Sequence, residues 1–223
     1  MSHEQEFLSA VQKGDVTKAK ELLKTDHSLA KAKNADGVSA LLLASYHRHK
    51  EIVQAFLATG VELDVFEASA TGQGDRVKAL LKKDASLANA FAADGFTPLG
   101  LAAYFAQKAV AEMLVAGGAR VNQAAKNPMK VMPLHSAVSS RQLEIARLLI
   151  EHGAEVNARQ QGGVTALHGT AAHGQIELAK LLLSHGADVN AKMDDGSTAL
   201  DLAVKNNQTE MADLLRKHGT SAR

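Results

Sequence analysis

Histidine is the first side chain to consider as a source of chemistry, because the chain contains ten of them. Histidine ligates metal ions and transfers protons near neutral pH. A zinc site needs ligands at set spacings, and the sequence has no HExxH motif, no histidine pair at i and i+4 beside an acid, and no cysteine. We therefore predict that the chain holds no metal ion and no cofactor.

The positions of several histidines favour structural roles. His152, His185 and His218 each directly precede a glycine. At such a position a cation faces the C-terminal end of a helix, which carries a partial negative charge. His47 and His49 belong to the polar run HRHKE, which is typical of a solvated turn.

Motifs for nucleophilic catalysis and phosphate binding are also absent from the sequence. No G-x-S-x-G segment follows an expected strand, and the serines fall in turns or helix interiors. Gly72-Gln73-Gly74 is expected to join two helices, whereas a phosphate loop joins a strand to a helix. We therefore predict that the protein is not an enzyme.

Segments of the C-terminal half recur at a fixed interval. Pro133-Leu134-His135, Ala166-Leu167-His168 and Ala199-Leu200-Asp201 lie 33 residues apart, and Gly153-Ala154 and Gly186-Ala187 repeat at the same interval. A period of this length predicts stacked units that cannot bury their apolar faces alone. Such a stack favours a surface that binds over a pocket that reacts.

The clearest unit runs from Gly163 to Ala191. Its apolar residues and glycines predict a turn, a short helix over 166–173, a second helix over 176–185 that stops at Gly186, and an extended return. The unit is thus a helix-turn-helix with a turn on either side.

The string GVTALHGTAAHGQIELAKLLLSHGADVNA in this unit resembles the ankyrin consensus T-P-L-H-x-A. Matches recur as DGFTPLGLAA (94–103), MPLHSAV (132–138) and DGSTALDLAV (195–204), with a weaker copy at DGVSALLLAS (36–45). The resemblance implies an all-α solenoid with short β-hairpin fingers and a concave face built by fingers and inner helices. It also implies that His135 and His168 bond within their turns and tie neighbouring repeats together.

The whole chain, 1–223, is interpreted as one domain of about seven repeats. Residues 14–45 also align with residues 72–103 at a shift of 58, which indicates that the first half is a duplicated pair of units. The predicted repeats span residues 7–33, 36–64, 65–92, 94–124, 130–158, 162–191 and 195–219.

Two joints depart from the pattern. Asp64 can cap a helix that starts at Val65, so we expect the joint at Leu63–Val65 to lack a finger. The segment Ala124–Met132 is two residues longer than its counterparts, so that finger should protrude. In the last repeat, Arg216 occupies a position that is apolar in earlier repeats. A polar residue there is typical of a capping repeat, so we expect the array of repeats to be complete.

Composition narrows the class of partner. The formal net charge is +1, which gives no global field for nucleic acid or for an acidic membrane surface. No apolar run approaches the roughly 20 residues that span a bilayer, and the N-terminus shows no signal peptide. The absence of cysteine fits a reducing compartment, so we expect a cytoplasmic monomer that binds neither nucleic acid nor membrane.

The resemblance places the two residues before each inter-helix turn on the concave face and adds the fingertips to it. The candidate protein-binding residues are Tyr46, His47, Phe96, Tyr104, Phe105, Met129, Val131, Arg159, His173 and Lys192. Exposed aromatic side chains on a preformed surface are typical interface anchors. The alternative for Tyr104 and Phe105 is that they fold back to fill the gap left by the missing finger.

We therefore predict a non-enzymatic scaffold that presents a concave groove to a partner protein, whose identity the sequence does not reveal. Two alternatives stay open. One is a soluble inhibitor or adaptor of a single cognate enzyme, and the other is a self-associating structural module.

Overall fold

The computed structural model describes residues 2–220 of the chain, and the regular secondary structure of these residues is almost entirely helical. In the described residues the α-helices are, in chain order, α1 (His3–Lys13), α2 (Val16–Thr25), α3 (Ala40–Tyr46), α4 (Lys50–Ala58), α5 (Val65–Thr71), α6 (Gly74–Lys83), α7 (Pro98–Tyr104), α8 (Lys108–Ala116), α9 (Pro133–Ser139), α10 (Leu143–Glu151), α11 (Ala166–Ala172), α12 (Ile176–Ser184), α13 (Ala199–Lys205) and α14 (Thr209–Thr220). Three short 3₁₀ helices accompany them, η1 (His27–Lys31), η2 (Ala85–Asn89) and η3 (Gln161–Gly163).

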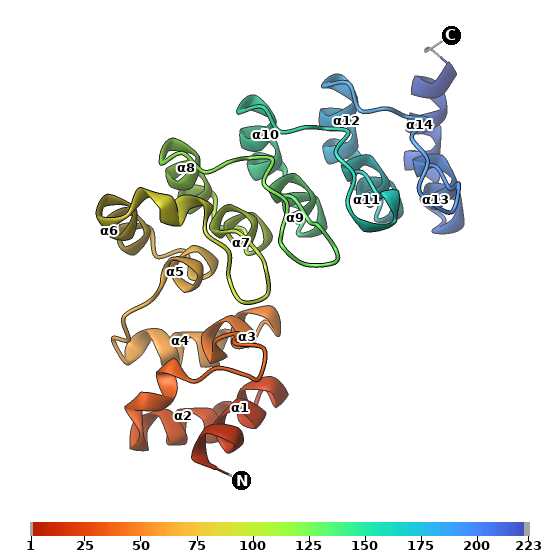
Figure 1. Cartoon of the computed structure of the whole chain (residues 1–223). Helices are drawn as coiled ribbons and strands as arrows, with labels where there is room; N and C mark the ends of the chain where they lie inside the picture. Colours follow the sequence, from red (N-terminus) through yellow and green to blue (C-terminus); the bar gives the residue numbers. More distant parts are fainter. Residues whose placement is uncertain (1, 221–223) are drawn as a thin grey trace.

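These α-helices form consecutive pairs, each with an odd-numbered inner helix and an even-numbered outer helix. Figure 1 shows the pairs stacked along a curved path with the two termini at opposite ends. Inner helices pack against inner helices of the neighbouring pairs, and outer against outer. The expected all-α solenoid is confirmed. The division into about seven repeats stays a prediction, and α1 begins at His3, before the start of the first predicted repeat at residue 7.

The inner helices depend on their caps and on burial. α7 is capped by Thr97, whose side chain accepts a hydrogen bond from the backbone N–H of Gly100 at 3.0 Å. Pro98 follows at the first helical position, where its missing N–H is not needed. A helix of two turns is not stable alone in water, so α7 is held by burial of side chains such as Leu101, which is 1% exposed.

β-hairpin fingers connect most of the pairs. Four fingers close through a backbone N–H that bonds to the carbonyl four residues later, at Asn34–Val38, Ala92–Phe96, Gln160–Val164 and Met193–Ser197. Neighbouring fingers are also joined by backbone bonds, from Lys126 N to Gly95 O, from Gln161 N to Met129 O and from Asp194 N to Gly162 O. The C-terminal fingers therefore form one continuous rim.

The joint between α4 and α5 has no finger. The Asp64 carboxylate caps α5 by accepting hydrogen bonds from the N–H groups of Phe66 and Glu67, each at 2.8 Å. The Glu67 side chain in turn accepts from the Asp64 N–H at 3.0 Å, which completes a capping box. The prediction that the joint at Leu63–Val65 lacks a hairpin is confirmed.

The stack changes direction at this joint. In Figure 1, α1 to α4 form the lower arm, and the pairs from α9 onward extend to the right in the upper arm. The outer helices α4 and α6 contact each other less than α2 contacts α4 or α6 contacts α8. The missing finger therefore coincides with a bend in the solenoid.

The finger before α9 is longer than the others. Its closing bond runs from the Ala125 N–H to the carbonyl of Val131, six positions apart, whereas the other fingers close over four. Lys130 adopts a left-handed conformation (φ +52°) to turn the chain back. Met129, at the tip, is 48% exposed. The predicted extra length at Ala124–Met132 is thus present as a wider loop.

Asparagine side chains tie the outer ends of neighbouring units together. Asn122 donates to the carbonyl of Gly153 at 2.9 Å and accepts from the Glu155 N–H at 2.8 Å. Asn157 makes the same pair of bonds to the next unit, with the carbonyl of Gly186 and the N–H of Asp188, both at 2.8 Å. These side chains satisfy backbone groups that the helix ends leave free.

Candidate protein-binding surface

The buried histidines serve as structural links. His135 Nδ1 accepts from the Met132 N–H at 3.4 Å, and its Nε2 lies 3.2 Å from the carbonyl of Ala158, just before the next finger. His168 makes the equivalent bridge to Ala191 at 3.1 Å. Burial lowers the pKa of both rings. The expectation that these rings bond within their turns is confirmed. Ala158 and Ala191 end the predicted repeats 130–158 and 162–191, so the second bond of each ring fixes the chain that leads into the next finger.

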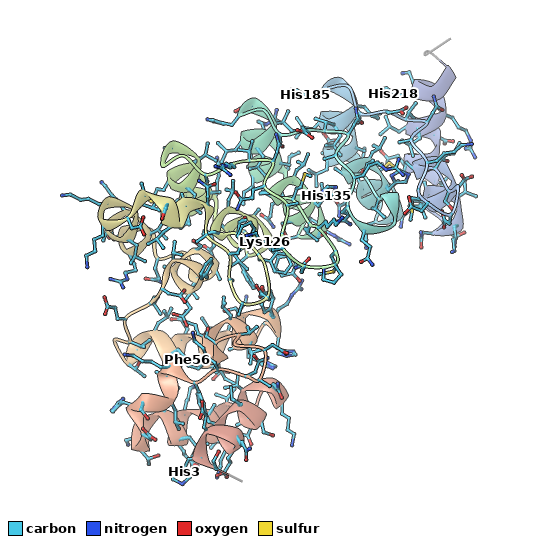
Figure 2. The ribbon with its side chains drawn as sticks, viewed as in Figure 1. His3, Phe56, Lys126, His135, His185 and His218 are labelled. Atoms are coloured by element: carbon cyan, nitrogen blue, oxygen red, sulfur yellow. The ribbon has the colours of Figure 1, made fainter. Side chains whose placement is uncertain are left out.

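The histidines before glycines lie at helix C-terminal ends as predicted. Nδ1 of His152, His185 and His218 lies 2.8, 2.8 and 2.9 Å from the carbonyl four residues earlier. Figure 2 shows His185 and His218 along the edge of the outer helices, away from His135. Within residues 2–220 no group of three or more potential ligand residues could hold a metal ion, and no helix there is long and apolar enough to span a membrane.

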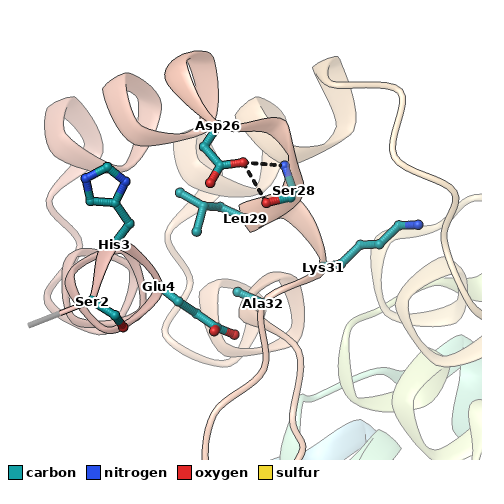
Figure 3. Close-up of a pocket in the computed structure, with 8 residues that line it drawn as sticks. All are labelled: Ser2, His3, Glu4, Asp26, Ser28, Leu29, Lys31 and Ala32. Atoms are coloured by element: carbon teal, nitrogen blue, oxygen red, sulfur yellow. Dashed lines mark hydrogen bonds between the residues drawn. The ribbon is translucent and has the colours of Figure 1, made fainter.

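A hollow of about 370 Å³ lies between the start of α1 and η1, near His3. Figure 3 shows that the Asp26 carboxylate bonds to Ser28, through its N–H at 2.9 Å and its hydroxyl at 2.6 Å. Asp84 and Ser86 make the same two bonds, at the same distances, at the start of η2. Asp26 and Asp84 thus cap the equivalent 3₁₀ helices η1 and η2. The fold therefore explains the two bonds between Asp26 and Ser28.

Three aromatic rings cluster at the bend of the solenoid, and we call them the aromatic trio. Tyr46 comes from the end of α3, whereas Tyr104 and Phe105 end α7. The ring centroid of Tyr46 lies 5.3 Å from that of Phe105 and 6.2 Å from that of Tyr104. Tyr104 and Phe105 meet edge to face at 5.1 Å. The trio therefore bridges two inner helices on either side of the missing finger.

Tyr46 is fixed in place by a hydrogen bond from its hydroxyl. The hydroxyl donates to the Asp94 carboxylate, in the finger before α7, at 2.7 Å. Burial, followed by the hydrogen bond to Asp94 and by the charge of its carboxylate, raises the pKa of Tyr46 well above its ordinary value. The phenol therefore stays protonated and keeps donating throughout the neutral range.

A hollow of about 360 Å³ opens beside the trio on the concave side, and we call it the concave groove. Its walls come from α3, α7, α9 and the fingers before α7, α9 and α11. The lining residues are Tyr46, Phe96, Leu101, Tyr104, Met129, Val131, Ser136, Ser139 and Gln160. Tyr104 and Met129 are 37% and 48% exposed, which is high for large apolar side chains. The groove is thus apolar on its walls, with a few polar groups between helix and finger.

The structure brings together the predicted residues Tyr46, Phe96, Tyr104, Met129 and Val131, all of which line the concave groove. This places side chains from three separate units on one surface.

The other predicted residues lie elsewhere. Phe105 is half-buried and lines a second cleft of about 300 Å³, beside α4. His47 is exposed and stacks on His49. The exposed residues Arg159, His173 and Lys192 occur further along the stack, and Arg159 forms an ion pair with Asp194 at 3.3 Å. Phe105 is not among the residues that line the concave groove, and its ring packs on Tyr46 at the bend, so its part in binding stays a prediction.

Sequence reasoning missed the role of Asp94 and of the polar lining residues Ser136 and Gln160. Asp94 belongs to the turn Asp94-Gly95, a common fingertip pair, and nothing in that pattern indicates a partner 48 positions earlier. Its contact with Tyr46 forms only because the unit between them has no finger. The length of the joint at Leu63–Val65 is the one signal that could have suggested it.

A family model described as ankyrin repeats (3 copies) matches residues 65–160 and 134–223. A protein of Rickettsia felis (strain ATCC VR-1525 / URRWXCal2), whose name refers to ankyrin repeats, is 44% identical over 66 residues. That alignment covers 30% of this chain and 29% of the relative, so the chain spans under a third of the relative's length in it. Ankyrin repeats are generally protein–protein interaction modules. With more than half of its length matched and a stack of helix pairs joined by fingers, the chain belongs to the ankyrin repeat family.

Proposed function

We propose that this protein is a non-enzymatic scaffold that binds a partner protein in the concave groove. The observation that carries the proposal is the groove itself, in which Tyr104 and Met129 leave large apolar surfaces exposed. Apolar patches on a soluble surface mark sites where another molecule binds. The general role of the family points in the same direction.

The groove is built from elements that are held in place before a partner arrives. Backbone bonds from Lys126 N to Gly95 O and from Gln161 N to Met129 O join the fingers that form its rim. Tyr46 is tied to Asp94. Because these parts are already ordered, this protein loses little conformational freedom when a partner binds.

The aromatic trio divides into a contact residue and a supporting residue. Tyr104 faces the groove and is more than one-third exposed. Phe105 is half-buried against Tyr46 and supports the ring from the side of the bend. The proposal therefore assigns partner contact to Tyr104, Phe96 and Met129, and assigns packing to Phe105.

The test uses affinity capture from extracts of the source cells, with the captured proteins quantified by mass spectrometry. The baits are the wild-type protein, Tyr104→Ala, Met129→Ala and the control Met113→Ala. Met113 lies on the outer helix α8 and is 38% exposed, which matches Met129 in type and nearly in exposure. We expect both groove variants to capture about tenfold less of a partner protein, which corresponds to a loss of about 1.4 kcal/mol in binding free energy. The control Met113→Ala should capture the same partner normally. If both groove variants capture every partner normally, the binding surface lies outside the groove.

The same experiment separates the alternatives. An inhibitor or adaptor of one enzyme would capture a single enzyme and change its activity. A self-associating module would show a dimer in sedimentation analysis that the change Met129→Ala weakens. The scaffold proposal requires neither outcome. It requires only that the capture of another protein depend on the groove residues.

A further inference from the structure

We infer that the concave groove binds an acidic segment of a partner protein, which inserts one bulky apolar side chain between Tyr104 and Met129. This inference rests on the proposed function and adds the chemistry of the partner. It draws on the charges around the groove, the apolar walls within it, and the free polar groups along its floor.

Charge around the groove is one-sided. The segments that border it are 40–46, 90–97, 98–104, 125–132, 133–139 and 158–165, and together they contain three Lys or Arg residues and one acid. That acid is Asp94, which already accepts hydrogen bonds from the Tyr46 hydroxyl at 2.7 Å and from the Phe96 N–H at 3.2 Å. The border thus offers cations to a ligand while its single carboxylate is engaged.

The cations lie on the fingers that form one wall of the groove. Lys130 directly follows Met129, is exposed, and makes no ion pair within the described part of the chain. Lys126 lies over the ring of Phe91, with its amine 4.2 Å from the centroid, and Figure 2 places it near the centre of the stack. Arg159 is held by Asp194 in an exposed pair, which a carboxylate ligand could replace at little cost.

The acids of the surrounding units lie on the other side of the solenoid. Between Asp94 and Glu155 the sequence contains three acids, Glu112, Glu144 and Glu151, and all three are on the outer helices α8 and α10. Over this stretch of the chain the acids therefore lie on the outer helices, whereas Lys126 and Lys130 lie on the finger that forms a wall of the groove. A cationic rim around an apolar hollow is complementary to an acidic segment with an apolar anchor.

The interior of the groove suits one large side chain and an extended backbone. Its volume of about 360 Å³ lies near the lower limit of the roughly 300–1,000 Å³ found for small-ligand pockets. The side chains of Ser139 and Gln160 line the hollow and make no hydrogen bond within the described residues. They are available to bond with the backbone of a segment whose anchor lies between Tyr104 and Met129.

The experiment selects a random peptide library, displayed on its own mRNA, on the immobilised full chain. The composition of the enriched pool is compared with that of the starting pool. An enriched peptide is then labelled and titrated by fluorescence anisotropy against the wild type, Met129→Ala, Lys130→Glu and the control Lys82→Glu. Lys82 is an exposed lysine on the outer helix α6, which contributes no residue to the lining of the groove.

We expect the enriched peptides to contain a large apolar residue and an excess of Asp and Glu. Kd should rise about tenfold in Met129→Ala and about fivefold in Lys130→Glu, and should not change in Lys82→Glu. Raising the ionic strength from about 0.05 M to about 0.5 M should weaken wild-type binding and shrink the effect of Lys130→Glu, because salt screens exposed charges. If Lys130→Glu lowers the melting temperature, Arg159→Gln replaces it and should weaken binding.

Several results would overturn the inference. Enriched peptides that are neutral or basic, but still depend on Met129, would overturn the acidic segment and leave the proposed function standing. Acidic peptides that are insensitive to both groove variants, or a library without enrichment, would remove the groove as the site. A dimer that Met129→Ala dissociates would identify a second copy as the occupant. A random single-stranded RNA that competes better than the peptides would identify a nucleic acid.

Discussion

The hydroxyl of Tyr46 offers a direct test of how the bend is held. The change Tyr46→Phe removes the hydrogen bond to the Asp94 carboxylate, 2.7 Å long, and keeps the ring that packs on Phe105. A hydrogen bond to a charged group contributes about 1.5–3 kcal/mol. Asp94 retains its bond from the Phe96 N–H at 3.2 Å, so its charge is not stranded and the lower end applies. We expect a loss of about 1.5 kcal/mol in the free energy of unfolding.

For a domain of this size, that loss corresponds to a fall of about 3–6 °C in melting temperature. The matched control is Tyr104→Phe, because the Tyr104 hydroxyl makes no hydrogen bond within the described residues and the ring belongs to the same trio. Its unfolding free energy should stay within about 0.5 kcal/mol of the wild type. The assay is thermal unfolding followed by circular dichroism. Equal melting temperatures for the two variants would refute the assignment of Tyr46–Asp94 as the tie across the bend.

Three further changes test other parts of the fold. Gly95→Ala should destabilise the protein more than Gly196→Ala, by about 1 kcal/mol or more in urea unfolding. The two glycines have similar φ angles, +83° and +85°, but a new Cβ at Gly95 would meet the Lys126 carbonyl oxygen at 2.6 Å. Asn157→Ala should lower the free energy of unfolding by about 1–2 kcal/mol through loss of two bonds to the next unit. Since burial lowers the pKa of His168, the unfolded state binds the proton more readily; stability should therefore be full above about pH 6.5 and fall below it, by at most about 1.4 kcal/mol per pH unit. Melting temperatures measured from pH 7.5 to 5.5 should show a smaller decline in His168→Gln.

The regular part of the fold was predictable because each local signal repeats in phase. Thr165 with His168, and Thr198 with Asp201, mark helix starts that the structure shows as capping boxes. The missing finger was predictable from the shortness of the joint between α4 and α5, since the cap Asp64 leaves no residues for a hairpin before α5. These features depend on neighbours within a few positions, which a single sequence displays directly.

The arrangement of the trio was not predictable from the same signals. The ankyrin pattern places Phe105 on the concave face, and the expected gap at the missing finger left open the alternative that Tyr104 and Phe105 fold back to fill it. Where the finger is missing, the space is open to whichever side chains reach it, and Phe105 turns toward the cleft beside α4. Tyr46 reaches Asp94 for the same reason. Contacts between residues 48 positions apart depend on the geometry of the bend, which local periodicity does not encode.

The missing finger and the groove are physically connected. A finger at the joint between α4 and α5 would occupy the space between the hairpins at 34–38 and 92–96, where Tyr46 now crosses to Asp94. Its absence makes room for the trio, and the trio supplies two walls of the groove through Tyr46 and Tyr104. The lengthened finger that carries Met129 supplies the facing wall. Two departures from the repeat therefore meet at one surface, which is where a departure from local rules is expected to serve function.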